Sequence, residues 1–484
     1  MVAGIRQLDE SHTLTNQQKI ILVIASIHGM LEFFDQFIVA FVLIFVMKPW
    51  HLTYGESAIV LLSSGIGAII GAIVWGYIAD QFGRRPALVA IVMTYSLSSL
   101  LLTFTPVGNW IYFAIFRVGV GLGVGGYIVN ITLVQECAPA RNRGWASGVI
   151  SVCAPAGLLL SAACAAFLTP IIGWRGLFIL GALPAFFVIV VLIFVPESPR
   201  WALRHGRPDL ARVSCARLLG ISPETVDLVP PEQIEVRTPK WTEIFIYRRS
   251  VTIGLLINLG VITGIYGLIL WSPALLVMVE RISPHTASEV MIAISLTNIL
   301  GRVVFSCLSE KVGRRASGAI SCFGGAILLV FTGWVAQGEV GLSSFFWLFL
   351  LVTFFLVDGG VAVSGPYTTE IWPSSLRASG SGFAYGVGSI GKITGPLGLA
   401  LLIGASNYIQ PEATVASIVP AFLYLSFWYV VAGLAYLFMG FETKGYSLEQ
   451  IEQSLEETPT SPTQTKEEFV AALNAGKSRS VGKV

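Results

Sequence analysis

The chain is a succession of long apolar segments separated by short polar loops. These segments cover residues 19–47, 57–79, 86–106, 110–135, 144–168, 174–195, 250–279, 287–308, 316–336, 343–366, 378–404 and 418–440. Each reaches the roughly 20 apolar residues that a helix needs to cross a bilayer. The first is long enough that it must tilt or project from the membrane. The pattern predicts an all-α membrane protein with twelve transmembrane helices.

The polar loops show that the chain is a duplication of two six-helix halves. The loop after the second segment contains Asp80, Gly83, Arg84 and Arg85, and the same positions recur 230 residues later as Glu310, Gly313, Arg314 and Arg315. The loop after the fourth segment contains Glu136 and Arg143, which recur 234 residues later as Glu370 and Arg377. A repeat of this length is too long for a solenoid. It fits two bundles that move against each other around a site between them.

The expected organisation follows from these halves. An N-terminal segment (1–18), a six-helix bundle (19–195), a linker with short amphipathic helices (196–249), a second bundle (250–440) and a polar tail (441–484) are predicted. A chain that is 54% hydrophobic and 12% charged agrees with a membrane protein, because soluble domains are about one quarter charged.

The distribution of Lys and Arg predicts the orientation. Five loops that lie on one side of the predicted topology hold 17 of these residues, and the opposite loops hold only Lys48, Arg175 and Arg281. Positively charged loops stay in the cytoplasm. Both termini are therefore expected in the cytoplasm, in a cell (inner or plasma) membrane. The net charge of +2 reflects orientation and not a nucleic-acid surface.

No motif for catalysis or cofactor binding is present. The six cysteines show no paired metal-ligand spacing, and the sequence contains no HExxH zinc motif, GxSxG nucleophile elbow or P-loop. We therefore expect no enzyme activity, no cofactor, no metal and no nucleic acid. The expected partners are a small-molecule substrate, a co-transported proton and the lipid bilayer, and the chain is expected to act as a monomer.

Together these motifs resemble the major facilitator superfamily. The resemblance rests on the Asp-Gly-Arg-Arg loop, Arg117 at the head of a glycine-rich fourth helix, Pro196 to Trp201 after helix six, and Glu442 to Gly445 after helix twelve. The chain looks like the branch with sugar porters, aromatic-acid and nicotinate proton symporters and organic-ion carriers. The resemblance covers residues 19 to 450, is specific for the fold and says little about the substrate.

The resemblance implies a cytoplasmic gate. Its residues would be Asp80, Arg84, Arg85, Glu136, Arg143, Glu310, Arg314, Arg315, Glu370 and Arg377, forming a charge network that locks the outward-facing state. The second copy departs from the pattern at Glu310 and Ser306, so a looser lock is expected there. The alternative is that these side chains only anchor helix ends at the headgroups.

Ionisable groups inside the membrane are candidates for function, because each costs about 2.5–3.5 kcal/mol at mid-helix. His28, Glu32 and Asp35 fall within roughly a 60° arc of helix one, which should face a polar cavity. By the resemblance, Asp35 and Arg117 form a proton-coupling pair, with Glu32 beside it. A purely structural Asp35–Arg117 bridge, and simple packing for His28, are the alternatives.

The second half contributes Arg302, Asp358 and Lys392. The three carboxylates inside the membrane, with Asp358 as the third, then balance the three cations, with Arg117 as the third. Protonation of one carboxylate leaves one excess positive charge, which suits a monovalent anion. Lys392 is the expected anion contact. The alternative is that Arg302 and Asp358 simply pair.

Aromatic residues and Ser389 complete the predicted substrate site. Tyr266, Trp271, Tyr367 and Tyr385 could form a stacking wall, although ordinary packing is the default for aromatics in a membrane. Related carriers place an Arg seven residues before the helix-eleven proline, whereas this chain has Ser389 there and Lys392 one turn later.

The leading interpretation is a secondary active transporter that imports a small organic anion, such as an aromatic or hydroxy-carboxylate, with a proton by alternating access. The alternative is a proton-linked sugar or polyol porter. It is disfavoured by the absence of glutamine from residues 258–266 of helix seven, where sugar porters carry it. A drug exporter and a transporter-like nutrient sensor rank lower.

Overall fold

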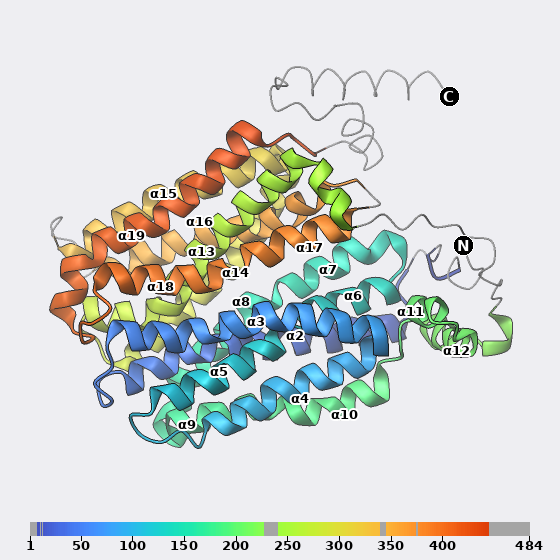
Figure 1. The fold of residues 1–484 in the computed structure, drawn as a ribbon, viewed down its shortest axis with the longest axis horizontal. Coiled ribbons are helices and arrows are strands. Elements are labelled where there is room, and N and C mark those ends of the chain that lie inside the picture. The colour runs from blue at the N-terminus through green and yellow to red at the C-terminus, as the bar shows by residue number, and fades with distance from the viewer. Residues whose placement is uncertain are drawn as a thin grey trace. The chain divides into compact units, whose positions relative to one another are not determined.

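The computed structural model describes residues 7–9, 11, 13–226, 241–338, 345–373 and 376–444. Twelve helical spans in these residues are long and apolar enough to cross a membrane, which confirms the predicted all-α fold with twelve transmembrane helices (Figure 1). The polar tail beyond residue 444, residues 227–240 of the predicted linker and residues 1–6 lie outside the described residues.

The chain divides into two compact units. The first contains α2 (Asn16–Val46), α3 (Tyr54–Phe82), α4 (Arg84–Leu102), α5 (Trp110–Val124), α6 (Tyr127–Cys137), α7 (Arg143–Ser151), α8 (Cys153–Phe167), α9 (Thr169–Ala182), α10 (Pro184–Phe194), α11 (Pro199–Arg204) and α12 (Pro208–Leu219). The second is built from α13 (Arg248–Val279), α14 (Pro284–Val312), α15 (Arg314–Gln337), α16 (Phe346–Glu370), α17 (Arg377–Gly388), α18 (Gly391–Ile403) and α19 (Pro411–Leu434). Ser272–Val277 and Ile282–Leu296, from α13 and α14, group with the first unit.

Several transmembrane spans consist of two helices joined by a tight turn. The fourth span changes from α5 to α6 at Gly125 and Gly126, and the fifth changes from α7 to α8 at Val152. The eleventh changes from α17 to α18 at Ser389 and Ile390. Apolar patterning alone predicts each of these as one segment, because a short turn leaves the hydrophobicity unchanged.

Helix ends follow local capping chemistry. Thr15 begins α2 with a capping box in which its side chain accepts from the Gln18 amide and the Gln18 side chain accepts from the Thr15 amide. Thr53 and Glu56 form the same arrangement at α3. Because of its capping box, α2 starts at Asn16, three residues before the predicted apolar segment begins.

Glycines allow α3 and α5 to pack backbone against backbone. A Cβ atom on Gly121 would lie 2.0 Å from the Ser64 carbonyl oxygen, and one on Gly67 would lie 2.0 Å from the Val118 carbonyl oxygen. Gly71 and Gly125 extend the same contact. Small residues permit this close approach in lipid, where van der Waals packing drives helix association. The glycine-rich fourth span is thus a packing surface of the first unit.

We predict that Gly121→Ala destabilises the first unit, because the added methyl group meets backbone that cannot rotate away. Overpacking of this kind costs about 1–3 kcal/mol, so the thermal unfolding temperature of the detergent-purified protein should fall. Gly148→Ala is the matched control, since a Cβ atom there meets nothing within 4 Å. Equal unfolding temperatures for the two variants would contradict the tight contact.

Candidate functional site

The first candidate site lies inside the first unit, where α2 carries two carboxylates with no exposed surface. Glu32 and Asp35 are both 0% exposed. Asp35 accepts a hydrogen bond from the Ser99 hydroxyl on α4 at 2.8 Å. A Cβ atom on Gly181 of α9 would lie 2.1 Å from the same carboxylate oxygen, so only glycine leaves room for it. The Asp35 carboxylate therefore points toward α4 and α9.

The expectation that the face of α2 with Asp35 turns toward a polar cavity stays a prediction, and the observed contacts of this carboxylate are within its own unit. The carboxylate is enclosed by helices of its own unit because the Ser99 hydroxyl offers it a hydrogen bond there. Sequence periodicity could place His28, Glu32 and Asp35 on one face. It could not identify Ser99 and Gly181 as what that face meets.

The side chain of Arg117 on α5 binds backbone carbonyl groups of α2. Its guanidinium donates to the carbonyl oxygens of Asp35 at 2.7 Å and Gln36 at 2.9 Å. Within the described residues, no nitrogen of Arg117 comes within 4.0 Å of the Asp35 carboxylate oxygens. The predicted partners are neighbours, and the described residues do not form the salt bridge that was the structural alternative, so the proton-coupling role stays a prediction. The Gln36 amide in turn donates to the Ser64 hydroxyl of α3 at 3.2 Å.

The second candidate site lies in the second unit, around Lys392. The Lys392 ammonium lies 5.4 Å from the ring centre of Tyr266 on α13 and 5.6 Å from that of Tyr385 on α17. These distances allow cation–π attraction to both rings. Lys392 is 7% exposed and stands just after the turn between α17 and α18. The Ser389 hydroxyl donates to the Tyr385 carbonyl of its own helix at 3.0 Å.

Three predicted substrate contacts, Arg302, Asp358 and Trp271, have hydrogen-bond partners inside the second unit. Arg302 forms two hydrogen bonds to Asp358, at 2.8 and 3.0 Å, so the two charges pair between α14 and α16. This is the simple pairing that the sequence left open. Trp271, fully buried, donates its indole N–H to the Pro396 carbonyl at 3.1 Å.

Tyr367 likewise has a partner in the backbone of its own unit. Its hydroxyl donates to the Phe441 carbonyl at 3.0 Å, and its side chain is fully buried. Of the expected stacking wall, Tyr266 and Tyr385 remain beside Lys392.

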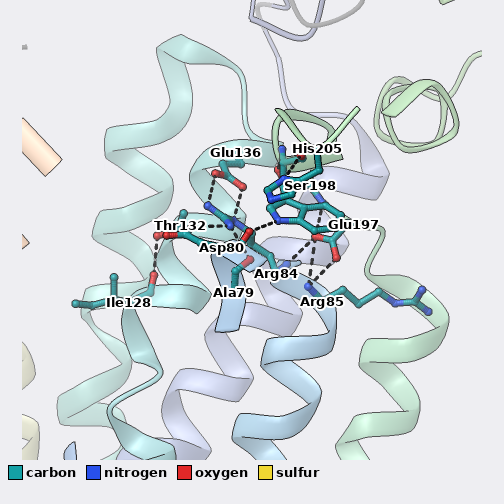
Figure 2. Close-up of polar contacts among 11 residues, drawn as sticks. Ala79, Asp80, Arg84, Arg85, Ile128, Thr132, Glu136, Glu197, Ser198 and His205 are labelled. Atoms are coloured by element: carbon teal, nitrogen blue, oxygen red, sulfur yellow. Dashed lines mark hydrogen bonds and ion pairs between the residues drawn. The ribbon is translucent and has the colours of Figure 1, made fainter. Parts of the chain in front are cut away.

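A charge cluster closes one end of the first unit. Arg84 donates to both carboxylate oxygens of Glu136, at 3.0 and 3.2 Å, and lies 2.9 Å from the Asp80 carboxylate (Figure 2). The Trp201 indole of α11 donates to the Asp80 carbonyl at 2.8 Å. Bidentate Arg–carboxylate pairs are strong and geometrically specific. The structure thus brings three predicted gate residues together.

Sequence reasoning missed the residue that organises this cluster. Glu197 accepts a hydrogen bond from the backbone N–H of Arg84 at 2.8 Å and from that of Arg85 at 3.2 Å, as Figure 2 shows. Burial raises the pKa of the Glu197 carboxyl, and the backbone donors and Arg84 oppose that rise. Gly83 has φ +113°, and a Cβ atom there would lie 2.3 Å from Glu197. Glycine is therefore required at this turn.

The second unit repeats the arrangement. Arg314 lies 3.2 Å from Glu310 and 3.0 Å from Glu370. Its backbone N–H donates to Glu442 at 2.8 Å, and Gly313 has φ +116°. The signal for Glu197 and Glu442 was in the sequence, because each follows the last helix of its half.

The remaining predicted gate arginines bond elsewhere. Arg315 donates to the Tyr436 carbonyl at 2.9 Å, Arg377 donates to the Trp372 carbonyl at 3.5 Å, and the Arg85 side chain donates to the Leu192 carbonyl.

Arg143 has a partner that the sequence did not reveal. Asp9, before the first span, accepts hydrogen bonds from Arg143 and, at 2.7 Å, from Arg200 of α11. Burial is the main cause that lowers the pKa of Arg143. Leu8, the residue before Asp9, is 0% exposed. The Thr15 hydroxyl donates to the Leu218 carbonyl of α12 at 2.6 Å. The N-terminal residues therefore tie α7, α11 and α12 together. No periodicity in the sequence predicts a contact for such a lone acid.

Comparison with known proteins is consistent with these features. The family model described as sugar (and other) transporter matches residues 21–455. The niacin transporter NiaP of Acinetobacter baylyi is 30% identical over 439 residues, which are 89% of this chain and 95% of the relative. The glucose transporter GlcP of Staphylococcus epidermidis is 25% identical over 453 residues, 90% of this chain and 97% of the relative.

Solved structures show the same fold. The chain is similar to the proton:xylose symporter XylE of E. coli with a TM-score of 0.69 and 22% identity, over 91% of this chain and 99% of that one. In the part of the chain that the structure describes, no group of three or more His, Cys, Asp or Glu residues could hold a metal ion.

We predict that Asp9→Asn lowers the thermal unfolding temperature, because two arginines lose their shared carboxylate. The groups are partly exposed, so the expected cost is about 1 kcal/mol. Glu412→Gln is the control, since the Arg281–Glu412 pair is 71% and 72% exposed and should contribute almost nothing. An Asp9→Asn variant as stable as this control would show that the contact contributes nothing.

Proposed function

The chain belongs to the sugar (and other) transporter family of the major facilitator superfamily, and we propose that it couples the uptake of a small organic anion to a proton. It is a multi-pass membrane transporter of a small molecule. Its proposed cycle is alternating access by a monomer, with both termini in the cytoplasm. The charge clusters around Arg84 and Arg314 then stand on the cytoplasmic side and lock the outward-facing state.

The charge balance inside each unit carries the proposal. By formal count the first unit buries two carboxylates, Glu32 and Asp35, and one guanidinium, Arg117, so protonation of one carboxylate makes this set neutral. By formal count, Arg302 and Asp358 cancel in the second unit, and Lys392 adds one positive charge. A monovalent anion beside Lys392 makes that unit neutral as well. Unbalanced charge is expensive in the membrane, so proton and anion each remove one excess charge.

The surroundings of Lys392 favour a flat carboxylate. Two tyrosine rings flank the ammonium, and such rings can stack on an aromatic or conjugated acid while the ammonium binds its carboxylate. Niacin, named for the relative at 30% identity, is an aromatic carboxylic acid. This supports an aromatic or hydroxy-carboxylate as the substrate class.

The second candidate function is a proton-linked sugar or polyol porter, which the glucose transporter relative favours. A sugar site needs several amide and hydroxyl hydrogen bonds. On α13 the Asn258 amide donates to the Gly254 carbonyl of its own helix at 2.8 Å. The Thr263 hydroxyl pairs with that of Thr394 at 3.2 Å. Because the Asn258 amide and the Thr263 hydroxyl already have partners, and Lys392 is nearby, we place the organic-anion substrate ahead of a sugar.

We predict that Asp35→Asn abolishes proton-driven accumulation and leaves exchange of substrate, because exchange returns the carrier loaded and needs no proton release. The measurement is uptake of labelled nicotinate into proteoliposomes under an imposed pH difference, beside counterflow without one. Asp209→Asn, on the exposed face of α12, is the control. Accumulation by the Asp35→Asn variant at the control level would exclude Asp35 as the coupling group and leave Glu32.

We predict that Lys392→Ala weakens nicotinate binding by about 30-fold to several-thousand-fold, since an unpaired buried charge costs about 2–5 kcal/mol. Lys392→Arg should keep part of the binding, because the charge remains while its shape changes. Glucose uptake is measured in parallel. Transport of glucose alone, unchanged by Lys392→Ala, would overturn the anion proposal in favour of the sugar porter.

A further inference from the structure

His28 on α2 is a buried titratable group that the proposed function leaves unused. It is 2% exposed, and neither ring nitrogen has a hydrogen-bond partner among the described residues. Its Nδ1 lies 3.8 Å from the Glu32 carboxylate, one turn along the helix. A buried polar group without a partner costs about 1–3 kcal/mol. Packing alone does not explain a residue with that cost at this position.

We propose that His28 is a proton-relay residue, which receives the proton from Glu32 and releases it toward the N-terminal end of α2. This inference rests on the proposed function, because it supplies the route by which the coupled proton leaves the first unit. It adds a second proton site to the carboxylates of α2.

Spacing along α2 orders the groups. With a rise of 1.5 Å per residue, Glu32 stands about 4.5 Å from Asp35 along the axis, and His28 about 6 Å beyond Glu32. His28 is therefore the member of the series closest to the end where α2 begins. That end also holds the Arg84 and Asp9 clusters, since Thr15 and Gln18 bond to α12 and to Cys137 there.

The step is a proton transfer that balances without another reactant. The O–H bond of protonated Glu32 breaks as an N–H bond forms at Nδ1 of His28, giving a carboxylate and an imidazolium. The proton at Nε2 then leaves to water at the N-terminal end, and neutral imidazole remains. The separation of 3.8 Å between Nδ1 and the Glu32 carboxylate exceeds hydrogen-bond length. A side-chain movement that shortens this distance by about 1 Å must therefore come first.

Groups on the neighbouring helices suit this transfer. Tyr95 of α4 places its ring centre 6.1 Å from that of His28, and its buried hydroxyl has no hydrogen-bond partner in the described part of the chain. Arg117 of α5 opposes a positive charge on His28, whereas Asp35 and Glu32 favour it. On α6 and α8, Tyr127 and Cys153 lie against the adjacent Gly29. Burial disfavours the charged imidazolium, so it is a transient species between Glu32 and water.

The test compares His28→Gln with a matched pair elsewhere. His28→Gln keeps a polar side chain of similar size that cannot carry the proton. The control is His285→Gln, because His285 and Glu289 form the same helical pair at 3.6 Å with side chains 44% and 47% exposed. Nicotinate accumulation under a pH difference should fall about 100-fold or more in His28→Gln, in line with loss of an acid–base group, and should not change in His285→Gln. Counterflow should stay within about two-fold of wild type in both variants, because exchange needs no proton transfer.

A partner variant and a substrate-free readout complete the test. Glu32→Gln combined with His28→Gln should be no slower than the slower single variant, because both act on one step. Infrared titration of the purified protein can follow the carboxylic-acid band of Glu32, which is identified because Glu32→Gln removes it. This band should disappear at a different pH in His28→Gln than in wild type.

The outcomes separate the relay from the proposed function. If wild type accumulates nicotinate and His28→Gln does so equally, the relay is overturned and the function stands. If wild type transports no acid, the function fails, and the infrared titration still decides whether Glu32 and His28 exchange a proton. An unchanged titration of the Glu32 band in His28→Gln would overturn the relay.

Discussion

A carboxylate that receives the first backbone N–H groups of a helix fixes the charged end of each unit. Glu197 does this for α4 and Glu442 for α15, across a glycine with positive φ in both cases. The first N–H groups of a helix have no partner within the helix, and a carboxylate at that position also meets the positive end of the helix dipole. Because the turn is fixed in this way, Arg84 and Arg314 are delivered to their acidic partners on α6 and α16.

The two units use buried charge differently. The second unit neutralises Arg302 with Asp358 in a direct bidentate pair and keeps Lys392 between tyrosine rings. In the first unit the Arg117 guanidinium is held by the backbone carbonyls of Asp35 and Gln36, and the Asp35 carboxylate accepts from Ser99. A guanidinium held by carbonyls stays in place whichever protonation state Asp35 adopts. The duplicated fold has therefore diverged where protons and anions would be handled.

Much of the fold could be predicted from the sequence because membrane helices are long and uniformly apolar. The twelve spans and the duplicated loops follow from that pattern. The turns inside spans could not be predicted, since Gly125 and Ser389 sit in apolar runs. Within the site, helical periodicity placed Glu32 and Asp35 on one face. The partners Ser99, Asp9 and Glu197 could not be predicted, because they depend on contacts between segments far apart in the chain.

The glycine contact between α3 and α5 has a mechanical consequence. Carbonyl groups of α5 fill the space beside Gly67 and Gly71, and a carbonyl group of α3 fills the space beside Gly121, so the two helices cannot slide or rotate past each other without separating. We therefore expect α3 and α5 to move together as one rigid body, which we call the strut. A spectroscopic label on α3 therefore also reports the motion of α5. A label on α6, beyond the turn at Gly125 and Gly126, can record a different displacement, so the pair of positions distinguishes movement of the whole strut from bending within the fourth span.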